Sequence, residues 1–105
     1  MLEGSLKLNV VYKNRNLQKV CTNTDAASKK YGIRMAQVIR TRIGQIKIAK
    51  NTEEMLYLRL GRCHALKGDR AGQYAMDLVH PYRLIFEQIG DVIQIARIVE
   101  ITDYH

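Results

Sequence analysis

Apolar and polar residues alternate near the start of the chain. Between residues 6 and 12 every second side chain is apolar, which is typical of a strand with one buried face. Asn14 follows and is a residue type that caps helix N-termini. Leu17, Val20 and Cys21 then recur at helical spacing. The segment therefore predicts a strand and a short helix.

A second, longer helix is expected over residues 26–50. Its apolar residues recur every three or four positions and form one stripe, while the lysines and arginines lie outside that stripe. The break before it, Thr22-Asn23-Thr24-Asp25, contains an N-cap. Gly32 predicts a kink or a restart, because glycine costs a helix about 1 kcal/mol relative to alanine. The pattern of residues 52–60 is ambiguous between a helical turn and extended chain.

The remaining residues have the pattern of short strands. Alternating apolar residues predict strands at 74–78, 82–86 and 93–101, after an extended segment at 62–66. A glycine-flanked turn at 67–72, the pair His80-Pro81 and Ile89-Gly90-Asp91 separate them. In the last strand Arg97 shares the apolar face, where a β-bulge would redirect it.

This order of elements predicts an α+β fold. An N-terminal strand and two helices precede a meander of three or four strands, so the helices are expected to pack on one face of an antiparallel sheet. The length of 105 residues predicts one domain over residues 1–105. No apolar run is long enough for a membrane span and the start does not resemble a signal peptide, so we expect a cytoplasmic protein with Cys21 and Cys63 reduced.

The distribution of charge indicates the class of partner. Lysine and arginine total 17 against 10 aspartates and glutamates, a net charge of +7. Residues 1–72 carry a net charge of +10, and residues 73–105 one of −3. A basic region of this extent favours nucleic acid or an acidic protein as partner over a merely solvated surface.

Motifs for cofactors and metals are missing from the sequence. There is no GxGxxG, Walker loop, HExxH or CxxC, so we expect no nucleotide cofactor and no structural zinc. Cys63-His64 together with His105 has no spacing of a common metal site, so we expect no metal.

Three polar features remain as candidates for chemistry: His64, Arg83 and the segment Asp103-Tyr104-His105. Metal-free RNA cleavage, in which the ribose 2′-hydroxyl attacks the adjacent phosphate, needs a base, an acid and cations. Histidine, lysine and arginine are suited to these roles, and tyrosine or histidine can stack on a base. From these residues alone a structural histidine remains an alternative.

The stretch from Gly61 to Tyr74 resembles the His-x-Leu-Lys-Gly-Asp-Arg-x-Gly-x-aromatic core of the HigB toxins. These plasmid maintenance killer proteins belong to the RelE/ParE superfamily. The resemblance continues through Tyr82-Arg83-Leu84-Ile85-Phe86 to Asp103-Tyr104-His105 and covers nearly the whole chain. It implies a RelE-like fold and a toxin that enters the ribosomal A site, cleaves mRNA and is held inactive by a HigA antitoxin with a helix-turn-helix domain.

The resemblance also assigns roles to matching residues. His64, Asp103, Tyr104 and His105 match active-site positions, and Lys67 and Arg83 match cations that hold the scissile phosphate. Which of His64, Asp103 and His105 is the base and which the acid stays open. Lys67 and Arg70 are equally suited to contact the RNA backbone in general.

Two other readings stay open at this point. The chain is similar to ParE proteins as well, which inhibit DNA gyrase, and it is also consistent with a catalytically decayed, antitoxin-binding module. One departure from the HigB pattern is visible: Pro81, preceded by His80, stands where many relatives have a small polar residue. That puts a polar contact to RNA at this position in doubt, and we interpret His80 as a turn residue.

Overall fold

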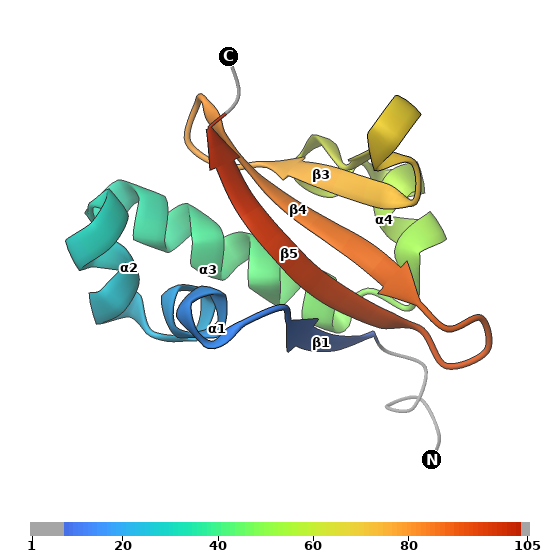
Figure 1. Cartoon of the computed structure of the whole chain (residues 1–105), viewed down its shortest axis with the longest axis horizontal. Helices are drawn as coiled ribbons and strands as arrows, with labels where there is room; N and C mark the ends of the chain where they lie inside the picture. Colours follow the sequence, from blue (N-terminus) through green and yellow to red (C-terminus); the bar gives the residue numbers. More distant parts are fainter. Residues whose placement is uncertain (1–7, 104–105) are drawn as a thin grey trace.

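A computed structural model describes residues 8–103 of the chain (Figure 1). Its elements are β1 (Asn9–Tyr12), α1 (Arg15–Thr22), α2 (Thr24–Tyr31), α3 (Ile33–Ile48), α4 (Thr52–Leu58), β2 (His64–Ala65), β3 (Gln73–Asp77), β4 (Tyr82–Ile89) and β5 (Ile95–Asp103). Two short 3₁₀ helices, η2 (Leu60–Arg62) and η3 (Gly68–Arg70), flank β2. No helix among these is long and apolar enough to cross a membrane.

The five strands form one mixed sheet in the order β1-β5-β4-β3-β2. The predicted meander is confirmed, because β2, β3, β4 and β5 pair antiparallel with their neighbours. The sheet differs from the expected all-antiparallel one at one edge, where β1 pairs with β5 in parallel. Two parallel strands need a long crossover connection, and here the helices, β2, β3 and β4 connect β1 to β5. The α+β class predicted from the sequence is confirmed.

A β-bulge interrupts β5 close to Arg97, as predicted. Ile85 lies opposite Glu100 and Phe86 opposite Ile98, so Val99 is the extra residue. The extra residue shifts the alternation by one position, so odd-numbered residues before the bulge and odd-numbered residues after it project from opposite faces of the sheet. Arg97 therefore points away from the core and pairs with a carboxylate of β4.

The helices begin at the caps that the sequence indicates. The side chains of Asn14 and Asn23 accept hydrogen bonds from backbone N–H groups in the first turns of α1 and α2. The long helix predicted over residues 26–50 is divided at Gly32, whose φ of 94° interrupts it between α2 and α3. The ambiguous segment after it forms the helix α4, which is capped by Asn51.

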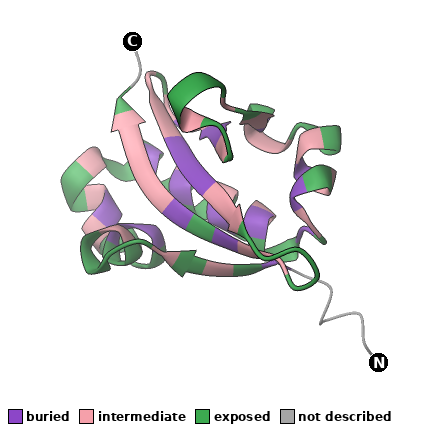
Figure 2. Cartoon of the chain, turned by 45° about the vertical axis from the view of Figure 1, so that its right-hand side comes forward, coloured by how far each residue is buried: buried purple, intermediate pink, exposed green. Residues whose placement is uncertain are grey.

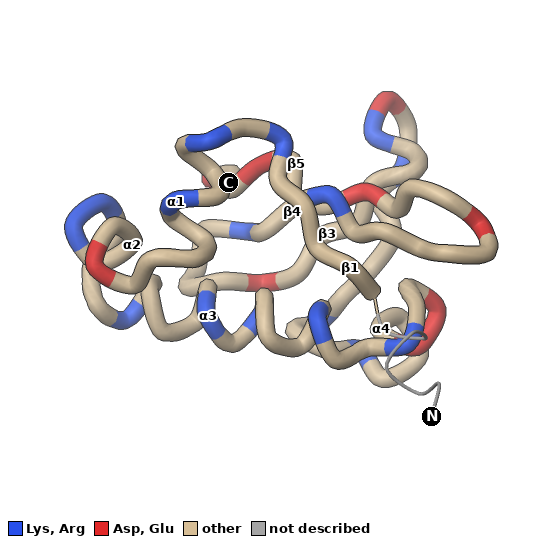
Figure 3. Tube along the Cα trace, turned by 90° about the horizontal axis from the view of Figure 1, so that it is seen from below, with Lys and Arg blue, Asp and Glu red and all other residues tan. Residues whose placement is uncertain are grey.

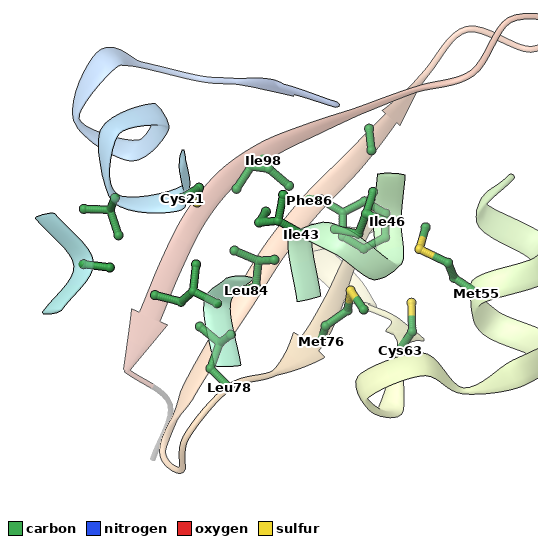
Figure 4. Close-up of a cluster of buried hydrophobic side chains, with 14 of the residues drawn as sticks. Cys21, Ile43, Ile46, Met55, Cys63, Met76, Leu78, Leu84, Phe86 and Ile98 are labelled. Atoms are coloured by element: carbon green, nitrogen blue, oxygen red, sulfur yellow. The ribbon is translucent and has the colours of Figure 1, made fainter. Parts of the chain in front are cut away.

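The core lies between α3 and one face of the sheet. Figure 2 shows buried residues in the middle of β4 and β5, and Figure 4 shows isoleucines of α3 packed against them. The largest fully buried side chains of this layer are Ile39, Ile46, Met55, Met76, Leu84, Phe86 and Ile98. The helices thus occupy one face of the sheet, and we call the opposite one the outer face.

Candidate functional site

His64 and Arg83 lie on the outer face of the sheet. His64 is the register partner of Ala75 in β3, and Arg83 in β4 is the register partner of Asp77, two residues further along β3. Directly paired residues project from the same face, so the two side chains lie in adjacent rows. Both line a hollow of about 300 Å³. The structure thus brings together two residues that the sequence singled out separately.

Two further arginines, Arg59 and Arg62, line the same hollow. They belong to the turn between α4 and β2, where their φ values are 54° and 55° and that of Gly61 is 56°. Left-handed backbone costs a residue with a side chain about 1–2 kcal/mol, so the rest of the structure must hold this turn. Backbone hydrogen bonds from Arg62 to Arg59 (2.9 Å) and from Cys63 to Leu60 (2.9 Å) close it. Sequence reasoning did not single out Arg59 or Arg62 as site residues, and their residue type gives no signal of a left-handed backbone.

The ring of His64 is oriented by the same turn. Its Nδ1 lies 2.9 Å from the carbonyl oxygen of Arg62. A carbonyl oxygen only accepts hydrogen bonds, so we assign the proton of the neutral ring to Nδ1. The lone pair is then on Nε2, which is the nitrogen able to take up a proton. In this tautomer Nε2 is the ring nitrogen that can act as a general base.

Asp77 connects the arginines of the site. Its Oδ2 lies 2.5 Å from Nε of Arg62, and its Oδ1 lies 3.7 Å from Nε of Arg83. A second, smaller hollow of about 80 Å³ adjoins this group and is also lined by His80 and Pro81. Sequence reasoning missed Asp77, because its role depends on pairing between β3 and β4 and on a turn fifteen residues away.

The other candidates from the sequence lie outside the first hollow. Lys67 is exposed just before η3, and Arg70 pairs with Glu100, Nη2 to Oε1, at 2.6 Å. Asp103 is exposed at the end of β5 and is the register partner of Tyr82, which packs against the core, so its side chain starts from the helix-covered face and not from the outer face. Tyr104 and His105 lie outside the described residues.

The cysteines are not set up as nucleophiles. Burial raises the pKa of the Cys21 thiol to about 12 and that of Cys63 to about 11. Both therefore stay protonated near neutral pH, whereas a nucleophile or metal ligand is a thiolate. Within residues 8–103 no three His, Cys, Asp or Glu side chains gather as a metal site would require.

Many of the lysines and arginines of the basic part of the chain lie on the helices. Lysines and arginines recur along α1, α2 and α3 (Figure 3). A hollow of about 430 Å³ between these helices has Arg40 and Lys47 among its lining residues. None of its lining residues is a histidine or a carboxylate, whereas His64 lines the hollow on the outer face of the sheet.

Comparison with known proteins identifies the type of fold. No family model matches the sequence, and no curated protein matches it. Among solved structures, the YoeB/ParE toxin from Agrobacterium tumefaciens superposes with a TM-score of 0.65 over 93% of this chain and 100% of that one, at 16% identity. The chain has the RelE/ParE toxin fold. This confirms the RelE-like architecture predicted from the sequence; at this identity the RelE/ParE toxin fold by itself specifies no activity.

Proposed function

We propose that this chain is the toxin of a type II toxin–antitoxin system, of the HigB type, and that it cleaves mRNA on the ribosome without a metal. The observation that carries the proposal is the placement of His64. Its Nδ1 is bound by a carbonyl, and its ring lines a hollow together with Arg59, Arg62 and Arg83. A base in the correct tautomer beside cations is what attack of a 2′-hydroxyl on phosphorus requires.

In this mechanism Nε2 of His64 removes the proton of the 2′-hydroxyl. The 2′-oxygen then forms a bond to phosphorus as the bond from phosphorus to the 5′-oxygen breaks. Arg83, Arg62 and Arg59 stabilise the negative charge that gathers on the equatorial phosphate oxygens. The products are a 2′,3′-cyclic phosphate and a free 5′-hydroxyl.

The remaining roles follow the resemblance to HigB toxins. We assign the acid that protonates the 5′-oxygen to Asp103 or His105, and stacking on a base of the mRNA to Tyr104. An exchange of the acid and base roles between His64 and these residues leaves the products unchanged. Lys67 and Arg70 are assigned to the RNA backbone on either side of the cleaved bond.

The proposal also specifies partners. The ribosome supplies the oriented mRNA, so the chain acts in the cytoplasm and cleaves free RNA weakly. A HigA-type helix-turn-helix antitoxin neutralises it, and the net charge of +7 favours an acidic antitoxin surface.

Inhibition of DNA gyrase is the second candidate, because the similar solved structure carries the name ParE as well as YoeB. In that case, or in a decayed module that only binds its antitoxin, His64 has no chemical task. A supercoiling assay with purified gyrase separates the first of these from the nuclease.

The deciding experiment is primer extension on a reporter mRNA after induced expression. The parent is compared with His64→Ala, with His105→Ala and with Gln37→Ala, which changes an exposed residue of α3. We expect cuts within the translated frame for the parent and for Gln37→Ala, and none for the two histidine variants. Growth arrest without cuts contradicts the nuclease and favours gyrase, and neither arrest nor cuts favours the decayed module.

A further inference from the structure

Arg62 contacts both His64 and Asp77, the first through its backbone and the second through its side chain. Its carbonyl oxygen faces Nδ1 of His64 at 2.9 Å, and its side-chain Nε lies 2.5 Å from Oδ2 of Asp77. The backbone of Arg62 is left-handed, with a φ of 55°. The orientation of the His64 ring therefore depends on a residue whose own conformation is unfavourable.

Asp77 is the fixed member of this group. It is paired with Arg83 in the sheet, and its backbone oxygen accepts a hydrogen bond of 2.6 Å from Nε of Arg42 on α3. Its side chain is 30% exposed, whereas that of Arg62 is 71% exposed. Because strand pairing and the Arg42 hydrogen bond fix Asp77 while Arg62 lies in a turn, the restraint runs from the strand to the turn.

We propose that Asp77 is a positioning residue: by holding the side chain of Arg62, it keeps the Arg62 carbonyl against Nδ1 of His64 and leaves Nε2 as the basic nitrogen. This inference rests on the proposed nuclease function for its kinetic part. Its structural part, the tautomer of His64, is measured on the free protein.

The charge of Asp77 and its positioning role have opposite effects on catalysis. A carboxylate beside the arginines weakens their attraction for a phosphate, so removing its charge strengthens RNA binding. Loss of the restraint on Arg62 lets the ring of His64 exchange tautomers and lowers the rate of the chemical step. Asp77→Asn is therefore expected to lower KM and to lower kcat by about two- to fivefold, because only the fraction of rings protonated on Nδ1 can act as the base.

The first test is NMR spectroscopy of the imidazole nitrogens, at a pH where the ring of His64 is neutral. We expect the proton on Nδ1 in the parent and a mixture of tautomers in Asp77→Asn and Asp77→Ala. In an Arg62→Gly background, where the connecting side chain is missing and glycine accepts the left-handed φ, the Asp77 substitutions are expected to change the tautomer less.

Glu87→Gln is the matched control, because Glu87 holds Arg97 on the same face of the sheet without contacting the hollow. It is expected to change neither the tautomer of His64 nor kcat. An Nδ1-protonated ring that is unchanged in both Asp77 variants overturns the proposal. So does a kcat of Asp77→Asn equal to that of the parent.

The two proposals fail in different ways. If the Asp77 variants shift the tautomer but no form of the chain cuts ribosome-bound mRNA, the positioning of His64 is supported and the nuclease is overturned. If the parent cuts mRNA and Asp77→Asn retains both the tautomer and kcat, the nuclease stands and the positioning role is overturned.

Discussion

Arg70 and Glu100 form an ion pair across the outer face of the sheet, with Nη2 of Arg70 2.6 Å from Oε1 of Glu100. The register partner of Glu100 is Ile85 in β4. Ile85 is fully buried although it projects from the face that the helices do not cover. The arginine that extends from η3 to β5 therefore helps to exclude water from Ile85.

Arg70→Ala is expected to destabilise the fold by about 1–2 kcal/mol. The half-exposed ion pair itself contributes about 1 kcal/mol at most, and the exposure of Ile85 adds to it. Urea unfolding measures the loss, with Arg97→Ala as control because its ion pair lies on the same face. Equal losses in the two variants would show that Arg70 does not protect Ile85.

Arg59→Ala is expected to weaken binding of single-stranded RNA and to reduce its salt dependence. Loss of one phosphate contact lowers the slope of log K against log salt by about 0.7. The slope is measured by titrating the protein, at several salt concentrations, with an oligoribonucleotide that cannot be cleaved because 2′-deoxynucleotides replace its ribonucleotides at the cleavage site. Arg34→Ala removes another exposed arginine, from α3, and is expected to leave the slope unchanged. If both variants show the same salt dependence of RNA binding, Arg59 does not contact a phosphate of the RNA.

The substitution of glycine by alanine is expected to have opposite effects at two positions. Gly32 has a φ of 94°, so Gly32→Ala destabilises by about 1–3 kcal/mol although nothing lies within 4 Å of the added Cβ. Gly44 lies inside α3 with equally open space, so Gly44→Ala stabilises by about 0.5–1 kcal/mol. Thermal unfolding of the two variants, run side by side, gives the signs; a Gly32→Ala protein as stable as the parent would contradict the role of backbone strain.

The stability of the fold is expected to decrease at alkaline pH. Burial raises the pKa of Cys21 to about 12 and that of Cys63 to about 11, from the ordinary value of 9.0. The folded chain thus keeps protons that the unfolded chain releases, and the stabilisation, complete below pH 9, is lost as the pH rises through these values. Each thiol contributes about 1.4 kcal/mol per pH unit in this window.

Urea unfolding at about pH 8 and about pH 10.5 checks this decrease, and the burial-raised pKa values of Tyr12 and Tyr31 act in the same direction. Cys21→Ala is the control, because it removes one of the titrating groups. Its stability should fall less steeply with pH than that of the parent, and an identical slope would show that Cys21 is not responsible.

The features that the sequence predicted correctly depend on neighbouring residues. Alternation identified the strands, Arg97 on an apolar face indicated the bulge, and Gly32 indicated the break between two helices. The helix α4 had a local signal as well, since Asn51 is followed three residues later by Glu54 and caps the helix.

The features that the sequence did not predict depend on distant residues or on backbone conformation. The parallel pairing of β1 with β5 joins opposite ends of the described chain and leaves no mark on the hydrophobic pattern. The left-handed backbone of Arg59 and Arg62 has no signature in residue type, because arginine rarely adopts it. Asp77 acquires its role only when β3 lies beside the turn that contains Arg62.

The position of β5 in the sheet has a consequence for the order of folding. β5 lies between β1 and β4, so the strand that leaves the ribosome last in the described chain is an interior one. Until it is synthesised, β1 has no partner and the core lacks Ala96 and Ile98. β2, β3 and β4 can pair earlier, but completion of the sheet must wait for residues 95–103, because β1 and β4 are joined only through β5. The hollow on the outer face is built from residues 59–83, so under the proposed function these residues are made before the strand that completes the core beneath them.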